Sequence, residues 1–261
     1  MLAQLEALGY VDTDTTPELS VNEAKTALMG GDPSRAATIL EELLAAHPNH
    51  APAVAAYADA LAQLGKHREA LTHYRALEGT ELWEDPGAVR GEIFSRFRVG
   101  EEAAAVDAAK KRVSSPGARE DHLLLAQLLN LSGDPEGARN ALAQALTQTP
   151  GDLILVEALA RMELGRGAVS NAETLLARYP EGEADLLLIR GLVAQQRGDL
   201  PQAVRAWTGA ADNDRTALEA RLLLARAYAA QGLREQAEHW LNQAAKLSNS
   251  PDVQKLKRAL R

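Results

Sequence analysis

"GDPSRAATILEELLAAHP" at residues 31–48 and "GDPEGARNALAQALTQTP" at residues 133–150 share a glycine, an aspartate and a proline at the start and a proline at the end. The two stretches begin 102 residues apart, which is three times 34. Glycine can take the left-handed conformation that ends a helix, aspartate can cap the next helix, and proline suits its first turn. Each stretch therefore predicts a turn followed by a helix. The shared pattern of residues indicates an internal repeat.

Small residues recur along the whole chain with this period. One series has spacings of 34 residues, except for one spacing of 31: Ala36, Ala70, Ala104, Ala138, Ala172, Ala203 and Ala237. A second series precedes the first by twelve residues: Ala24, Ala58, Ala126, Ala160, Gly191 and Ala225. A glycine lies between the two members of each pair: Gly31, Gly65, Gly133, Gly167, Gly198 and Gly232. Each unit therefore predicts helix, glycine turn and helix, with small residues where the two backbones approach each other.

Helix pairs of 34 residues with small residues at these places, a glycine turn and a closing proline resemble the tetratricopeptide repeat family. The resemblance implies an all-α, right-handed superhelical solenoid of about seven repeats, in which each unit packs only on its neighbours. We expect the repeats at residues 17–50, 51–84, 85–118, 119–152, 153–183, 184–217 and 218–250. Residues 251–261 are expected to form a C-terminal capping helix, in which Val253, Leu256 and Leu260 cover the last repeat.

Two units depart from the pattern. In the third unit the period puts Glu92 at a small-residue position, and burying an unpaired carboxylate between helices is costly. We therefore expect Gly91 to take that position and the turn near Gly100 to carry one extra residue. In the fifth unit Pro180 comes early, so its second helix is expected to be nearly a turn short and the superhelix to bend near residues 178–186.

Composition excludes several classes of function. The chain is 46% hydrophobic but only 4% aromatic, which favours helices rich in alanine and leucine. No run approaches the roughly 18 apolar residues of a membrane span. A net charge of −8 argues against a nucleic-acid partner, because such binding needs a basic stripe. The lack of cysteine excludes disulfides and thiolate metal sites, but it does not distinguish the cytoplasm from the periplasm.

No catalytic group or cofactor site is predicted. The six histidines show neither metal-ligand spacing nor a Ser-His-Asp arrangement, so we expect no enzyme activity, no metal and no cofactor. In a solenoid of this kind the first helices line a concave groove, and a stripe offset by about 100° from the packing stripe faces it. The candidates on this stripe are Asn22, Lys25, Asp59, Gln63, Glu92, Arg96, Gln127, Asn130, Glu157, Arg161, Gln195 and Arg226.

These side chains can hydrogen-bond an extended peptide, and Val21, Leu123, Leu188 and Leu222 between them are expected to receive its apolar side chains. The leading hypothesis is a non-enzymatic scaffold that binds a protein or peptide partner in the concave groove.

Residues 1–16 lie outside the period. "LAQLEALGYV" predicts an amphipathic lead-in helix with Leu2, Leu5 and Leu8 on one side. Residues 1–11 also resemble the C-terminal tail of sulfatase-type hydrolases, which implies an alternative function as the accessory repeat region of such an enzyme. A third hypothesis is a self-assembling scaffold, because the first twenty residues carry four acids and the last eleven are basic.

Overall fold

The computed structural model describes residues 16–113, 119–248 and 250–260. Within these ranges the regular elements are α-helices and one short 3-10 helix, with no strand, so the predicted all-α class is confirmed. The chain divides into two units, Met1–Gly117 and Ala118–Arg261, called unit 1 and unit 2 below. Residues 1–15 of the predicted lead-in helix lie outside the described residues.

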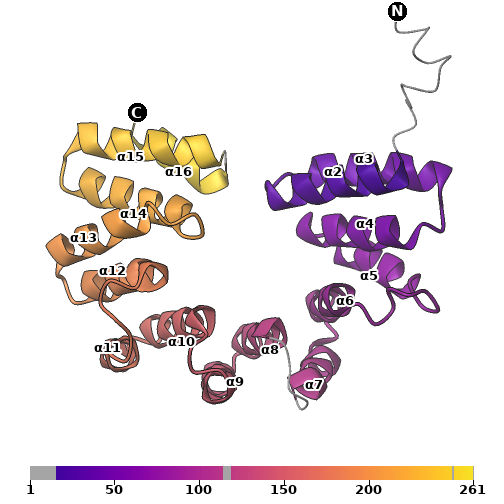
Figure 1. The fold of residues 1–261 in the computed structure, drawn as a ribbon, viewed down its shortest axis with the longest axis horizontal. Coiled ribbons are helices and arrows are strands. Elements are labelled where there is room, and N and C mark those ends of the chain that lie inside the picture. The colour runs from indigo at the N-terminus through magenta and orange to yellow at the C-terminus, as the bar shows by residue number, and fades with distance from the viewer. Residues whose placement is uncertain (1–15, 114–118, 249, 261) are drawn as a thin grey trace, which may run out of the picture. The chain divides into compact units, whose positions relative to one another are not determined.

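Unit 1 consists of helices that pack two by two in chain order (Figure 1). They are α2 (Pro17–Met29), α3 (Pro33–Ala46), α4 (Ala51–Gln63), α5 (His67–Arg75), α6 (Pro86–Arg98) and α7 (Glu102–Val113). Each helix contacts the next, and the first helices of the pairs, α2, α4 and α6, also contact one another in sequence. The first helices therefore form one layer of unit 1 and the second helices another.

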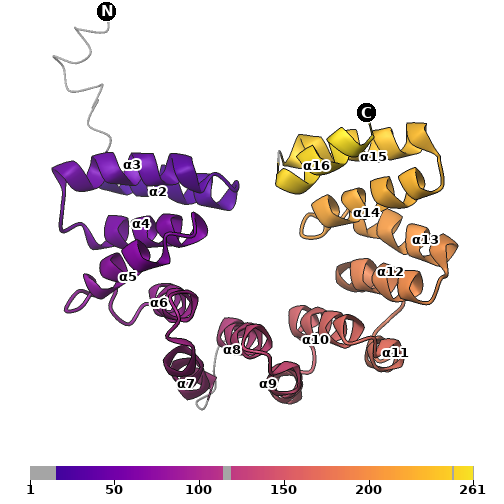
Figure 2. The same ribbon diagram turned by 180° about the vertical axis from the view of Figure 1, so that it is seen from behind.

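Unit 2 repeats this arrangement and ends in a single extra helix (Figure 2). Its elements are α8 (Arg119–Leu131), α9 (Pro135–Gln148), α10 (Leu153–Gly165), α11 (Val169–Leu176), η1 (Ala184–Leu186), α12 (Leu187–Gln196), α13 (Leu200–Ala210), α14 (Ala217–Ala230), α15 (Arg234–Leu247) and α16 (Pro251–Ala259). Val253 of α16 is 1% exposed, and Leu256 and Leu260 pack beside it against a core that includes Leu222 and Leu241. These three side chains therefore pack on the core that α14 and α15 form.

The turns between paired helices have the predicted chemistry. Their glycines all have positive φ angles, between 74° and 101°: Gly31, Gly65, Gly100, Gly133, Gly167, Gly198 and Gly232. Asp32 accepts a 3.0 Å hydrogen bond from the Arg35 amide, and Asp134 accepts one of 2.8 Å from the Gly137 amide. These carboxylates accept hydrogen bonds from backbone amides that have no partner within the first turn of the helix. This explains why the sequence Gly-Asp-Pro recurs at residues 31–33 and 133–135.

The small residues lie where the helices meet. All members of the series from Ala24 to Ala225 are buried, and so are those of the series from Ala36 to Ala237, with one exception. Ala104 is exposed, and Ala105 is buried in its place. The assignment of Ala104 is therefore wrong by one residue. The physical reason is the extra residue before Gly100, because Ala105 follows Gly100 by the same five positions that separate Ala36 from Gly31.

Both irregular units contain the local features that the sequence predicts, whereas the bend expected near residues 178–186 stays a prediction. A Cβ atom on Gly91 would lie 2.2 Å from the Tyr74 hydroxyl, so Gly91 occupies the close-approach position in place of Glu92. Helix α11 has 8 residues, compared with 14 in α9, and ends before Pro180. Carbonyl groups at the end of α11 and just after it accept hydrogen bonds from the Arg190 guanidinium, whose Nη2 atom lies 2.9 Å from the oxygen of Leu176 and 2.9 Å from that of Tyr179.

Candidate partner-binding surface

The twelve candidates on the first helices differ in exposure. Those with exposed side chains are Asn22, Lys25, Gln63, Gln127, Asn130, Gln195 and Arg226. Asp59, Glu92, Arg96 and Arg161 are half-buried, and Glu157 is buried. The exposed side chains of this polar stripe are therefore accessible to a partner, whereas the half-buried and buried ones contact other residues of the protein.

The exposed candidates lie directly beside the packing positions. Lys25 follows buried Ala24, and Arg226 follows buried Ala225. Because successive helical residues are about 100° apart, a buried small residue places its successor at the edge of the helix contact. The stripe of polar residues thus borders the helix–helix interface along each first helix.

The apolar residues expected between them are mostly part of the core. Val21 is 3% exposed, Leu188 is 1% exposed and Leu222 is 8% exposed. The expectation that these three side chains receive a partner's apolar groups is wrong, because they pack against neighbouring helices instead. Leu123 is half-buried.

In unit 1, Asp59 of α4 lies between helices and is held by Tyr74. The Tyr74 hydroxyl donates a 2.6 Å hydrogen bond to Asp59 Oδ1. Burial raises the pKa of Asp59 above its ordinary value, and nearby Asp85 adds to this, while the Tyr74 hydrogen bond and the charge of Lys25 act in the opposite direction. Burial, together with Asp59, also raises the pKa of Tyr74. The hydrogen bond between Tyr74 and Asp59 therefore joins α5 to α4.

Glu92 and Arg96 of α6 pair with each other. Their side chains are 17% and 27% exposed and form an ion pair one helical turn apart. The Arg96 Nε atom also lies 3.5 Å from Glu101 Oε2 in the turn after α6. Glu92 additionally lines a pocket with residues of α5 and α7. Both charges are therefore partly satisfied within unit 1.

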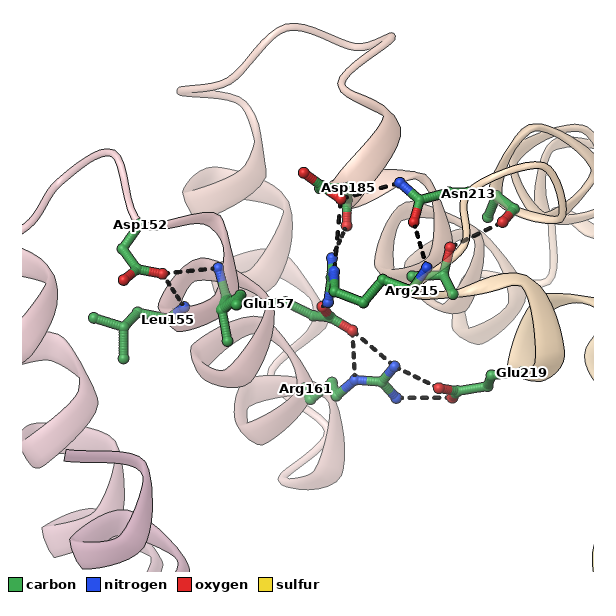
Figure 3. A network of polar contacts seen from close by, with 11 residues as sticks. Asp152, Leu155, Glu157, Arg161, Asp185, Asn213, Arg215 and Glu219 are labelled. Carbon is green, nitrogen blue, oxygen red and sulfur yellow. Dashed lines mark hydrogen bonds and ion pairs between the residues drawn. The ribbon is translucent and has the colours of Figure 1, made fainter. Parts of the chain in front are cut away.

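In unit 2, Glu157 of α10 is the centre of a polar network (Figure 3). Its side chain is 9% exposed, and its Oε1 atom accepts hydrogen bonds from Nε and Nη2 of Arg161 at 3.1 and 2.9 Å. Its Oε2 atom accepts a hydrogen bond from Nη1 of Arg215. Two guanidinium groups thus compensate one buried carboxylate, whose burial without a partner would be costly.

The network extends from Arg161 to α14. The Nη1 and Nη2 atoms of Arg161 donate to the two carboxylate oxygens of Glu219 at 2.9 and 2.8 Å, which is a bidentate pair. Burial by itself would lower the pKa of Arg161, but hydrogen bonds and charges of Glu219 and Glu157 raise it. Glu219 is 58 residues away in sequence, so this pair joins α10 to α14 across the intervening α12.

Arg215 joins the same network to η1. Its Nη2 atom donates a 2.8 Å hydrogen bond to the carbonyl oxygen of Asp185, and Nδ2 of Asn213 donates a 3.0 Å bond to Asp185 Oδ1 (Figure 3). The shortened fifth unit is followed by η1 at this position. The network therefore ties together the segments around the place where the repeat spacing falls from 34 to 31 residues.

The structure thus brings Glu157 and Arg161 together, but as partners of each other. Arg215, Glu219 and Asp185, which complete the network, are not among the residues predicted from the sequence. The four-residue spacing of Glu157 and Arg161 is typical of an ion pair on a helix surface, but nothing in the sequence indicates that Arg215 and Glu219 lie beside them. Arg226 has a similar but looser pair, 3.6 Å from Asp252 of α16.

The described residues offer no centre for metal chemistry. They contain no group of three or more histidine, aspartate or glutamate side chains that could hold a metal ion. His50 caps α4 by accepting a 3.2 Å hydrogen bond from the Ala53 amide, and the His73 ring packs edge-on against Tyr57. In the same part of the chain, no helix combines the length and apolar character needed to cross a bilayer.

Comparison with known proteins assigns the fold to a family. The tetratricopeptide repeat family model matches residues 27–79, 129–195 and 194–260, which is more than half of the chain. The chain belongs to the tetratricopeptide repeat family. Members of this family are in general non-catalytic scaffolds that bind protein partners. The number of repeats and the handedness of the solenoid stay predictions.

Solved tetratricopeptide repeat structures share the fold. A tetratricopeptide repeat protein from Parabacteroides merdae is 16% identical and aligns over 94% of this chain and 98% of its own, with a TM-score of 0.59. PilW, a type IV pilus biogenesis factor, is 17% identical over 81% of this chain and 100% of its own, with a TM-score of 0.51. A monomeric mutant of IFIT1 with m7Gppp-AAAA is 19% identical over 99% of this chain and 56% of its own, with a TM-score of 0.55.

A search of curated proteins finds no match to this tetratricopeptide repeat chain. None of the comparisons supports the resemblance of residues 1–11 to sulfatase-type hydrolases, and these residues lie outside the described part of the structure. The alternative function as an accessory region of such an enzyme is therefore unsupported.

Proposed function

We propose that the protein is a non-enzymatic scaffold that binds an extended or helical segment of a protein partner on the surface of its first helices. Membership of the tetratricopeptide repeat family supports the general role. The observation that carries the specific site is the stripe of exposed polar side chains beside the buried small residues of the first helices. Such a stripe keeps polar groups exposed to solvent while the neighbouring residues hold the helices together.

The exposed amides and cations supply the binding chemistry. In unit 1 they are Asn22, Lys25 and Gln63, and in unit 2 they are Gln127, Asn130, Gln195 and Arg226. An amide side chain offers both donors and an acceptor, so it can pair with the N–H and C=O groups of a peptide backbone. Each such hydrogen bond contributes about 0.5–1.5 kcal/mol, and several in a row are needed for useful affinity.

The half-buried candidates have a different role in this proposal. Glu157 and Arg161 are engaged with Arg215 and Glu219, and Glu92 with Arg96, so they orient the helices on which the exposed residues lie. Asp59 does the same through its hydrogen bond with Tyr74. We therefore assign direct partner contact to the exposed members of the stripe and support of the surface to the half-buried ones.

Charge reversal on the first helices, compared with charge reversal on the second helices, tests the proposed partner-binding surface. The first-helix variant Lys25→Glu/Arg226→Glu is compared with Arg68→Glu/Arg205→Glu, which makes the same change in charge at exposed positions of α5 and α13. Bait protein is used to capture partners from native cells, which are quantified by mass spectrometry, and helicity is checked by circular dichroism. We expect the first-helix variant to lose partners that the second-helix variant retains. Equal capture by both variants would contradict the proposed surface.

A further inference from the structure

The connection between α5 and α6, residues 76–85, presents an exposed tryptophan among acids. Trp83 is 42% exposed, whereas Trp207 in unit 2 is fully buried. The acids of this connection are all exposed: Glu78, Glu81, Glu84 and Asp85. We call residues 76–85 the acidic connection. Exposing a large aromatic side chain forgoes the gain of burying it, so its retention on the surface points to a contact with another molecule.

The acidic connection is held in place by its own hydrogen bonds. The Thr80 hydroxyl donates to the Leu77 carbonyl at 2.7 Å and accepts from the Leu82 amide at 3.2 Å. The Trp83 amide donates to the Thr80 carbonyl at 3.2 Å, and the side chain of Leu77 is 1% exposed. Trp83 is therefore presented by an ordered turn, which reduces the entropy that binding must offset.

Trp83 borders a pocket of about 480 Å³. The lining residues are Tyr74, Leu77, Trp83, Glu84, Ala88, Val89, Glu92 and Arg112. Most of these residues are apolar or aromatic: Tyr74, Leu77, Trp83, Ala88 and Val89. A volume of this size accepts a long side chain whose stem is apolar.

The acidic connection beside the pocket carries four carboxylates, whereas the pocket itself is lined by two carboxylates, of Glu84 and Glu92, and one guanidinium, of Arg112. Glu92 is paired with Arg96, and Arg112 has an interaction of its own. Within the described residues, Glu84 forms no ion pair, and the same holds for Glu78 and Glu81 on the acidic connection. The excess carboxylate charge therefore lies next to the Trp83 ring.

We propose that this pocket binds an arginine or lysine side chain of a basic segment in a protein partner. Tryptophan has the aromatic face to which a cation is most strongly attracted, and such a contact contributes more when a carboxylate lies beside it. The cation lies over the Trp83 ring near Glu84, and its alkyl stem packs against Val89. Trp83 is then the anchor of the interface and Glu84 selects for positive charge.

The proposal goes beyond the partner-binding surface of the first helices. The pocket is built from α5, the acidic connection, α6 and α7, and Glu92 is its one residue among the twelve candidates. A variant that disables the exposed first-helix stripe, such as Lys25→Glu/Arg226→Glu, therefore leaves this pocket unchanged. The two proposals can fail separately.

Binding is measured on the full chain with two capped peptides, Gly-Leu-Arg-Leu-Gly and its analogue with citrulline in place of arginine. Citrulline has nearly the shape of arginine and no charge. The three tryptophan indole N–H signals are followed in proton–nitrogen correlation spectra, and Trp83→Phe assigns the signal of Trp83. We expect the arginine peptide to shift the Trp83 signal saturably and the citrulline peptide to bind at least about three-fold more weakly.

Two variants test the roles of the residues. Glu84→Gln is expected to weaken binding of the arginine peptide about three- to ten-fold, whereas Glu42→Gln, an exposed acid of α3, leaves it unchanged. An unshifted Trp83 signal, equal affinity for the citrulline peptide, or unaltered affinity in Glu84→Gln would overturn the proposal. A Trp83 shift that depends on protein concentration without peptide would assign the pocket to a second copy of the chain and would equally overturn it.

Discussion

Gly91 of α6 lies directly against the ring of Tyr74 in α5. A Cβ atom on Gly91 would lie 2.2 Å from Tyr74 Oη and 2.5 Å from Cζ, well inside contact distance. This close approach lets the Tyr74 hydroxyl reach Asp59 on α4. One glycine therefore permits a tyrosine to join three helices of unit 1, at a position where all but one of the other repeats have alanine.

Gly91→Ala should destabilise unit 1. The added methyl group cannot be accommodated without moving the Tyr74 ring, so we expect a loss of about 1–3 kcal/mol in the free energy of unfolding. Urea unfolding followed by circular dichroism measures the change. Gly165→Ala at the end of α10 is the matched control, because its Cβ would meet nothing within 4 Å. The control should be neutral or stabilising by up to about 1 kcal/mol, and equal losses in both variants would refute the crowding argument.

Asp59 should make stability depend on pH. Its pKa is raised in the folded state, mainly by burial, so the folded protein holds the proton more tightly than the unfolded chain does. The resulting stabilisation is fully present below the ordinary pKa of 3.8 and is lost as the pH rises through the raised value. Asp59→Asn stays neutral and keeps an oxygen that can accept from Tyr74. We therefore expect Asp59→Asn to gain stability relative to the unsubstituted protein as the pH rises.

Urea midpoints measured from about pH 3.5 to pH 7.5 check this expectation. Asp107→Asn, which removes an exposed charge from α7, controls for the change in net charge. If the difference between Asp59→Asn and the unsubstituted protein stays constant across this range, burial does not dominate the ionisation of Asp59.

The two carboxylates that bind Arg161, those of Glu157 and Glu219, should contribute differently to the free energy of unfolding. Glu157→Gln leaves the Arg161 and Arg215 guanidinium groups facing a neutral amide in a buried position, so we expect a loss of about 1–3 kcal/mol. Glu219 is 48% exposed, and Glu219→Gln should cost at most about 1 kcal/mol. Urea unfolding at low and high salt distinguishes the two contributions, because salt screens the exposed Arg161–Glu219 pair more than the buried pairs of Glu157. A larger effect of Glu219→Gln would reverse the assigned order.

The helix pairs could be predicted because their determinants are local. A glycine with positive φ and a small residue five positions after it act within one helical hairpin, so each repeat carries them in the same order, and in three hairpins an aspartate caps the second helix. The same logic identified Gly91 as the substitute for a small residue and α11 as a short helix. The prediction of Ala104 was wrong because one extra residue before Gly100 shifts the buried position to Ala105.

The polar network around Glu157 was less predictable because its contacts join residues of repeats that are not adjacent in the sequence. Arg161 and Glu219 are 58 residues apart and meet through the packing of α10, η1 and α14, which no spacing in the sequence encodes. Exposed amides such as Gln127 were identifiable from their place after a small residue. The burial of Leu188 and Leu222 was not, because a leucine beside the packing stripe can face either the core or solvent.

Trp207 of α13 should be coupled to Gly191 of α12. A Cβ atom on Gly191 would lie 2.3 Å from Trp207 Nε1, and the tryptophan side chain is fully buried. In the described structure Nε1 has no hydrogen-bond partner, so Trp207→Phe removes volume without breaking a hydrogen bond. We expect Gly191→Ala to cost about 1–3 kcal/mol by crowding and Trp207→Phe about 1–2 kcal/mol by leaving space.

In the double variant the added methyl group can use the space that the smaller ring vacates. The loss in Gly191→Ala/Trp207→Phe should therefore be smaller than the sum of the single losses by about 1 kcal/mol or more. Urea unfolding of the four proteins in the cycle gives this coupling free energy. Additive losses would mean that the two side chains do not compete for the same space and that Gly191 is required only by the backbone of α12.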